Sequence, residues 1–137
     1  MKKRFIIVFV SVSIITILAY LQFGRDVTAK NSISNVSGNY YELNLTVIAN
    51  KLFIYDKENF SEQILERCLD NSFHDILFSY DITGYPDRIC ISVYTNSLTY
   101  SFGIESIKIQ YESTSNHSEN VTDAQDKFKI LIDTTNH

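Results

Sequence analysis

Hydrophobic and polar positions change pattern several times along this chain, and the first pattern is a long apolar run. Phe5 to Gly24 is a stretch of 20 residues without a charged side chain, and Lys2, Lys3 and Arg4 come directly before it. As a helix that rises about 1.5 Å per residue, this run would span about 30 Å, the thickness of a bilayer's hydrocarbon core. Because it is apolar all round, we interpret it as a membrane helix and not as a core helix.

The charges beside the run predict its orientation. Under the positive-inside rule the N-terminus stays in the cytoplasm, and everything after Arg25 lies outside. Signal peptides have a shorter apolar region, of about 7 to 15 residues, and a small-residue cleavage site. Val27-Thr28-Ala29 offers such a site, so secretion after cleavage near Ala29 is the alternative. Because the run is long, we expect residues 1–29 to remain as a signal-anchor in the cell membrane.

The chain then becomes polar before it takes up a strand pattern. Residues 30–39 are rich in Ser and Asn and contain few apolar side chains, which predicts a tether. After Tyr41, apolar Leu43, Leu45 and Val47 alternate with polar residues, a period of two that is typical of a strand with one buried face. Residues 52–55 extend this strand or form a second extended piece. The predicted domain covers residues 40–112.

A helical period follows. Phe60, Ile64 and Cys68 recur at intervals of four, and charged side chains occupy the other faces. Asp56 or Asn59 is suited to cap the first turn. We therefore expect a helix that ends near Asn71 and buries one side.

The rest of the predicted domain has mainly strand character. Residues 76–82 and 89–94 flank the turn Thr83-Gly84-Tyr85-Pro86-Asp87, which predicts a β-hairpin. Alternation at 98–102 and 107–111 predicts two further strands. Residues 113–137 form a polar linker and a short C-terminal element. Residues 128–132 fit either a strand or a helix, and the capping-box spacing of Thr122 and Gln125 favours a short helix.

Together these elements predict an α+β fold. An N-terminal membrane helix precedes a small two-layer domain in which one helix packs on an antiparallel meander, in the order β-α-β-β-β. This element order resembles that of the cystatin-like fold, in which a meander cradles a helix. The resemblance implies an architecture and carries no site residues.

Charge narrows the choice of partners. From Lys30 onward six lysines and two arginines stand against fifteen acidic residues, a net charge of −7. Nucleic acid and anionic lipid are bound chiefly through Lys and Arg, so we expect neither as a charge-driven partner. An acidic row on the predicted helix, Glu58, Glu62 and Glu66, is either a solvated face or a contact for a basic partner. Tyr85, at the predicted turn tip, is the best single candidate for a partner contact.

The two cysteines are candidates for one disulfide, since the exterior of a cell is oxidising. Cys68 belongs to the apolar stripe of the predicted helix, whereas Cys90 alternates out of phase with Ile89 and Ile91. The two thiols would then lie on opposite faces of the sheet, too far apart to bridge. We expect two free thiols. Cys68, Asp70, His74 and Asp75 match no standard spacing for a metal site, and we expect neither metal nor cofactor.

Three functions fit these observations. The first is a non-catalytic binding or assembly module on the outer face of a membrane. The second is a secreted enzyme whose site is assembled from scattered residues; the chain has four glycines and no phosphate loop or nucleophile elbow. The third is a small subunit of a membrane complex that acts through its helix, with Ser11, Ser13, Thr16 and Ala19 as small contact residues. We favour the first.

Overall fold

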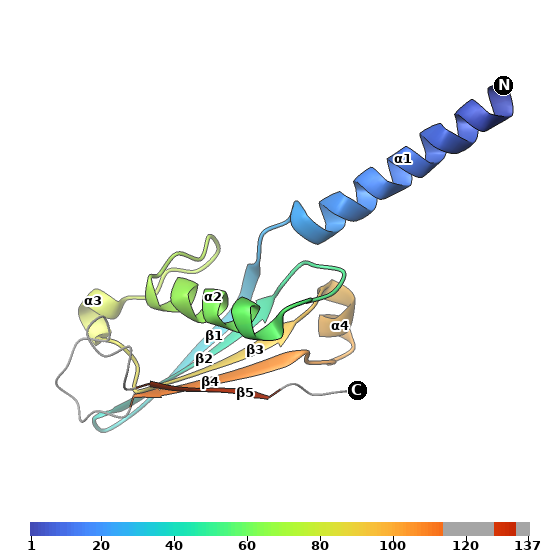
Figure 1. Cartoon of the computed structure of the whole chain (residues 1–137). Helices are drawn as coiled ribbons and strands as arrows, with labels where there is room; N and C mark the ends of the chain where they lie inside the picture. Colours follow the sequence, from blue (N-terminus) through green and yellow to red (C-terminus); the bar gives the residue numbers. More distant parts are fainter. Residues whose placement is uncertain (114–127, 134–137) are drawn as a thin grey trace.

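The computed structural model of the chain describes residues 1–113 and 128–133. A long helix projects from a sheet that carries a second helix on one face (Figure 1). The elements are α1 (Lys2–Phe23), β1 (Thr28–Ser37), β2 (Tyr40–Ile48), α2 (Lys57–Leu69), α3 (Tyr80–Thr83), β3 (Arg88–Tyr94), α4 (Ser97–Ser101), β4 (Ile107–Ser113) and β5 (Phe128–Asp133). The predicted α+β class is confirmed.

The sheet has five strands in the order β1-β2-β3-β4-β5. Neighbouring strands are antiparallel except for β2 and β3, which are parallel and are connected through α2. The prediction of a purely antiparallel meander is therefore wrong. Two strands precede α2, and it links parallel neighbours, so the cystatin-like element order is not confirmed.

The core lies between α2 and one face of the sheet. Alternate residues of three strands are almost fully buried there: Leu43, Leu45, Val47, Ile89, Ile91, Val93, Ile107, Ile109 and Tyr111. Phe60, Ile64, Leu65 and Cys68 of α2 pack against them. The apolar alternation and the helical period both predicted these buried faces, because each pattern follows from local backbone geometry.

Helix α2 begins where the sequence predicted. Asp56 is its N-cap, and Oδ1 of that residue accepts a hydrogen bond from the backbone N–H of Asn59 at 3.0 Å. Such a cap satisfies one of the amides that the first turn leaves without a partner. The helix ends at Leu69, and Asn71 follows in a left-handed conformation with φ 54°.

The segment predicted as a tether is mostly a strand. β1 pairs with β2 from Thr28 to Ser37, and Gly38, at φ 61°, allows the chain to turn back. Most β1 side chains are exposed, as expected for an edge strand with a polar surface. β1 is held mainly by backbone hydrogen bonds to β2. Backbone hydrogen bonds do not require alternating apolar side chains, so the sequence shows no strand period here.

The predicted hairpin of residues 76–82 and 89–94 is also wrong. In place of the first strand the structure has a loop and the short helix α3. The side chain of Asn71 holds this loop by bonds to both backbone groups of Phe78, each 2.7 Å long. Asp87 then exchanges hydrogen bonds with the backbone of Tyr41, so β3 starts beside β2.

Two further elements differ from the prediction. Residues 97–101 form α4, because Asn96 and Thr99 make a capping box that the apolar alternation concealed. Residues 128–133 form β5, which pairs antiparallel with β4, and the prediction of a short helix is wrong. Residues 52–55 are a loop and not a strand. The proposed cap at Thr122 and Gln125 lies outside the described residues.

Candidate functional site

The most distinctive feature of the structure is the junction between α1 and the domain. α1 is exposed along nearly its whole length, but Gln22 in its last turn is buried. Its Nε2 donates to the carbonyl of Phe53 at 2.9 Å, and its Oε1 accepts from the backbone N–H groups of Leu52 and Phe53 at 3.0 and 3.2 Å. One carboxamide thus binds the loop between β2 and α2 in the way that a neighbouring strand would.

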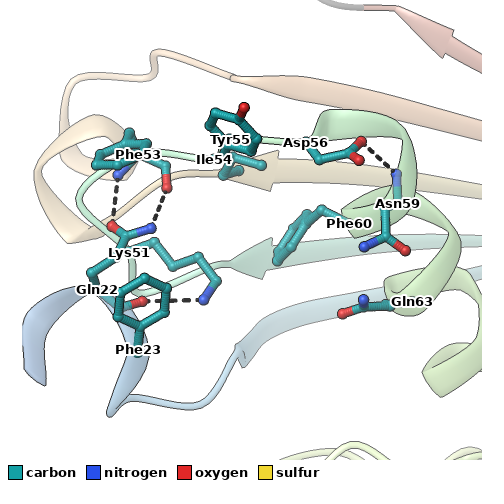
Figure 2. Close-up of a pocket in the computed structure, with 10 residues that line it drawn as sticks. All are labelled: Gln22, Phe23, Lys51, Phe53, Ile54, Tyr55, Asp56, Asn59, Phe60 and Gln63. Atoms are coloured by element: carbon teal, nitrogen blue, oxygen red, sulfur yellow. Dashed lines mark hydrogen bonds between the residues drawn. The ribbon is translucent and has the colours of Figure 1, made fainter. Parts of the chain in front are cut away.

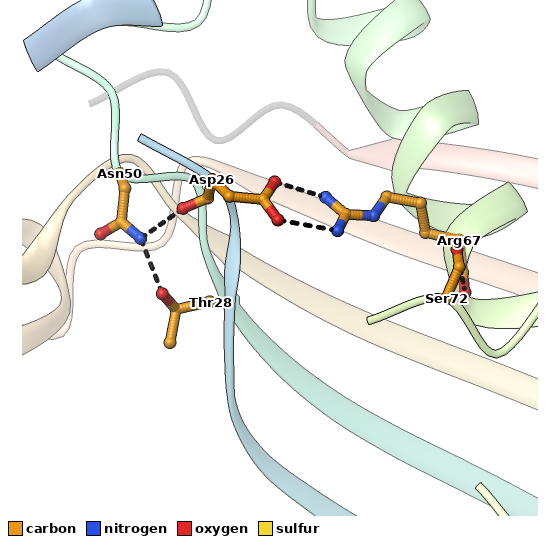
Figure 3. A network of polar contacts seen from close by, with 5 residues as sticks. All are labelled: Asp26, Thr28, Asn50, Arg67 and Ser72. Atoms are coloured by element: carbon orange, nitrogen blue, oxygen red, sulfur yellow. Dashed lines mark hydrogen bonds and ion pairs between the residues drawn. The ribbon is translucent and has the colours of Figure 1, made fainter. Parts of the chain in front are cut away.

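Further polar contacts surround this junction (Figure 3). Asp26 forms a bidentate ion pair with Arg67 of α2, with N–O distances of 2.8 and 3.0 Å. Asn50, at φ 56°, donates from Nδ2 to the carbonyl of Asp26 and to Oγ1 of Thr28, each at 2.8 Å. The side-chain bonds of Arg67 lower the pKa of Asp26, which stays ionised. These contacts fix the connection between α1 and β1 against two other elements.

A shallow pocket opens beside the junction (Figure 2). Its lining joins Gln22 and Phe23 of α1 to the loop residues Lys51 and Phe53 and to Phe60 of α2. Lys51 Nζ donates to the carbonyl of Gln22 at 3.2 Å. The pocket holds about 170 Å³, whereas pockets that enclose drug-sized ligands hold roughly 300–1,000 Å³. Its size suits a single side chain or a few water molecules.

α1 has the length and apolar character to cross a membrane, features shared by membrane anchors and signal sequences. Residues 2–20 are exposed except for the partly buried Ser13, and the helix projects away from the sheet (Figure 1). The predicted span from Phe5 to Gly24 matches the helix closely, and Gly24 is its C-cap.

The acidic candidates lie on the outward side of α2. Glu58, Glu62 and Glu66 are all exposed and follow one another at helical spacing. Among the residues that the structure describes, none of the three forms an ion pair. They make a negatively charged row accessible to a partner.

Tyr85, the predicted contact residue, is not a free turn tip. Its ring stacks on Tyr80 with centroids 4.7 Å apart, and Tyr80 stacks on Phe78 at 5.3 Å. Tyr85 is still 37% exposed. The three rings form one aromatic stack, of which Tyr85 is the most exposed member.

Cys68 lies below this aromatic stack. The Tyr80 hydroxyl donates to the carbonyl of Cys68 at 2.9 Å and contacts Sγ at 3.6 Å. Burial raises the pKa of Cys68 to about 11 and raises the pKa of Tyr80 as well. Both groups are neutral at physiological pH, and a neutral thiol is a poor nucleophile and metal ligand.

Cys90 lies on the other face of the sheet, half-buried between Asn44 and Gln110 of the neighbouring strands. Both thiols are free. Burial also raises the pKa of Cys90. Within residues 1–113 and 128–133, no three His, Cys, Asp or Glu side chains are placed to hold a metal ion.

Sequence reasoning missed the junction. Gln22 is the first amide side chain in an otherwise apolar and hydroxyl-bearing run, and that was the available signal. Its partners are the backbone groups of residues about thirty positions away, which no sequence pattern identifies. Asp26 and Arg67 are likewise 41 residues apart.

Comparisons with known proteins add no relative: no family model, no curated protein and no solved structure matches the chain.

Proposed function

We propose that the chain is a single-pass membrane protein with its domain on the extracellular side, where it acts as a non-catalytic binding or assembly module. The observation that carries the proposal is the junction between α1 and the domain. Gln22 binds the loop of Leu52 and Phe53, and Asp26 binds Arg67. A leader that is discarded has no reason to supply contacts to the mature domain.

The core supports retention in the same way. Val27 and Ala29 are buried, at 8% and 6% exposure, and Ala29 pairs with Val47 of β2. Cleavage near Ala29 would remove Gln22, Asp26 and Val27 and would leave Arg67 without its carboxylate. Lys2, Lys3 and Arg4 favour a cytoplasmic N-terminus.

Protease accessibility in intact cells tests this topology. The full chain with a C-terminal epitope tag is expected to stay with membranes after alkaline carbonate extraction, at full length, and to lose its tag to protease added outside. A soluble product that starts at Lys30 would overturn retention. A tag that resists protease until the cells are lysed would overturn the orientation.

The contact surface that charge favours is the row of Glu58, Glu62 and Glu66. Like charges four residues apart on a helix cost a few tenths of a kcal/mol each. A basic partner surface would offset that cost and would speed association at low salt.

Crosslinking on intact cells tests this row. The triple variant Glu58→Gln/Glu62→Gln/Glu66→Gln is expected to lose a crosslinked partner that wild type captures, and salt should weaken capture by wild type. Asp75→Asn/Asp81→Asn, which removes two exposed carboxylates elsewhere, is the control and should retain the partner. Equal capture by wild type and the triple variant would exclude the acidic row as the contact.

The two alternatives make different demands. A secreted enzyme would need an activated group in a cleft, but the shift at Cys68 favours its neutral form. A subunit that acts through α1 would use its small residues, and the hydroxyls of Ser11, Ser13 and Thr16 already donate to carbonyls four residues earlier. Replacement of residues 5–21 by an unrelated apolar sequence, with Gln22 kept, should preserve capture of the crosslinked partner if the domain makes the contact.

A further inference from the structure

Exposed apolar side chains gather at the end of the domain from which α1 projects. They come from the last residue of α1, from the loop between β2 and α2, and from α4 with its C-cap. The set, which we call the apolar collar, is Phe23, Leu52, Phe53, Tyr55, Leu98 and Phe102. Each of these residues is at least 41% exposed. Exposed apolar side chains that gather in this way indicate a surface that contacts a protein or a membrane.

Hydrogen bonds hold the parts of the collar side by side. The backbone N–H of Lys51 donates to the carbonyl of Thr95 at 3.0 Å, and Asn96 Nδ2 donates to the carbonyl of Lys51 at 3.4 Å. The start of α4 therefore lies beside the loop that Gln22 binds. Figure 1 shows α4, this loop and the last turn of α1 at the same end of the domain. The collar is continuous with the helix.

The length of α1 sets the level of the collar. Its 22 residues span about 33 Å at about 1.5 Å per residue, slightly more than the hydrocarbon core. With Lys2 and Lys3 at the inner boundary, Phe23 reaches the outer boundary. The bonds from Gln22 keep Leu52 and Phe53 near the same level.

The composition of the collar fits a membrane interface. Phenylalanine, tyrosine and leucine gain free energy when they insert at the headgroup boundary, roughly 25 cal/mol per Å² of apolar surface buried. The Lys51 ammonium group, which donates to the carbonyl of Gln22, lies at the same level and can also contact headgroups there. The net charge of −7 from Lys30 onward opposes attraction to anionic lipids, so apolar insertion and not charge would drive this contact.

We propose that the apolar collar inserts into the outer interface of the bilayer that α1 crosses, so that the domain rests on the membrane in one orientation. This inference rests on the proposed function, in which α1 is retained as a span. α3 and the turn between β1 and β2 lie at the opposite end of the domain (Figure 1) and would project away from the membrane.

Single tryptophans provide the test, because the chain contains none. The full-length protein is reconstituted into phosphatidylcholine vesicles, with and without bromine on the acyl chains, as three variants. Phe102→Trp reports on the collar and Phe9→Trp on the middle of α1. Ile82→Trp replaces an exposed side chain of α3 and serves as the control. We expect brominated lipid to quench Phe9→Trp and Phe102→Trp, with blue-shifted emission, and to leave Ile82→Trp unquenched.

Each of the other outcomes would overturn insertion of the collar into the bilayer. If Phe9→Trp is quenched and Phe102→Trp is quenched no more than Ile82→Trp, the collar does not touch lipid, although α1 still spans the membrane. An unquenched Phe9→Trp overturns the span and the collar together. If Phe102→Trp is blue-shifted but unquenched and the protein has twice its monomer mass in detergent, a second copy of the chain covers the collar.

Discussion

The side chain of Gln22 and the backbone of Phe53 are joined by two reciprocal hydrogen bonds. Nε2 donates to the carbonyl at 2.9 Å, and Oε1 accepts from the N–H at 3.2 Å. A single residue thus satisfies both backbone polar groups of a loop residue at the boundary between the apolar helix α1 and the domain. The last turn of α1 becomes part of the folded unit, and its direction relative to the sheet is fixed.

Loss of this carboxamide should destabilise the domain. Gln22→Leu keeps an apolar stem but leaves three backbone groups without partners, and we expect the free energy of unfolding to fall by about 1 to 3 kcal/mol. Urea unfolding of the full chain in detergent measures the change. Gln63→Leu, an exposed glutamine beside the same pocket, is the control and should change stability by less than about 0.5 kcal/mol. Equal losses in the two variants would show that Gln22 has no special role.

The ion pair of Asp26 and Arg67 should make stability depend on acid pH. Its contribution is small, below about 1 kcal/mol, because the Asp26 side chain is 65% exposed. Arg67 holds the pKa of Asp26 below its ordinary value of 3.8. The contribution is therefore present above pH 3.8 and is lost as pH falls through the lower pKa of the folded state.

Comparison of wild type with Asp26→Asn across this range measures the effect. Wild type should be the more stable at neutral pH, and the difference should vanish in acid. High salt should also reduce it. A stability difference that does not change with pH would mean that the carboxylate charge contributes nothing.

The two thiols should react very differently. At neutral pH an alkylating reagent should modify the half-buried Cys90 before the buried Cys68, which should react only after denaturation. Mass spectrometry of native and denatured protein counts the modified sites. Without reductant both thiols should be available in denaturant. A disulfide between them would appear as two unreactive cysteines.

Burial of Cys68 also predicts an alkaline effect. Its pKa is raised from 9.0 to about 11, so its contribution to stability is present below pH 9.0 and is lost as pH rises toward 11. Cys68→Ala should remove this part of the alkaline dependence, although the smaller side chain lowers stability overall. The measurement is the difference in free energy of unfolding between wild type and Cys68→Ala across about pH 8 to 11. Cys90→Ala is the control.

Helix α4 should depend on its capping box. Asn96 accepts hydrogen bonds from the backbone N–H groups of Leu98 and Thr99, each at 3.1 Å. Asn96→Ala should cost about 1 kcal/mol of stability. Ser101→Ala removes an exposed hydroxyl from the other end of α4 and should cost much less. If the two substitutions cost the same, the box does not determine where α4 starts.

The sequence predicted those parts of the candidate site that single side chains define. Glu58, Glu62 and Glu66 are exposed because Phe60 and Ile64, at the same helical period, are buried. The sequence predicts a turn at Tyr85 but no aromatic stack, because it predicts a strand over residues 76–82, where Phe78 and Tyr80 lie. The sequence does not predict the collar, because its residues come from three separate segments. A single exposed apolar side chain in any one of them is common in proteins and indicates no site.

The sequence by itself determined the apolar helix α1, the capped helix α2 and the buried faces of β2, β3 and β4. Each of these depends on a repeating period set by the geometry of one element. Only the tertiary structure decided that residues 28–37 form an edge strand, that β2 and β3 run parallel and that Gln22 joins α1 to the domain. Those features consist of hydrogen bonds to backbone groups far away in the chain, and every residue carries the same backbone groups, so no local pattern reveals which will pair.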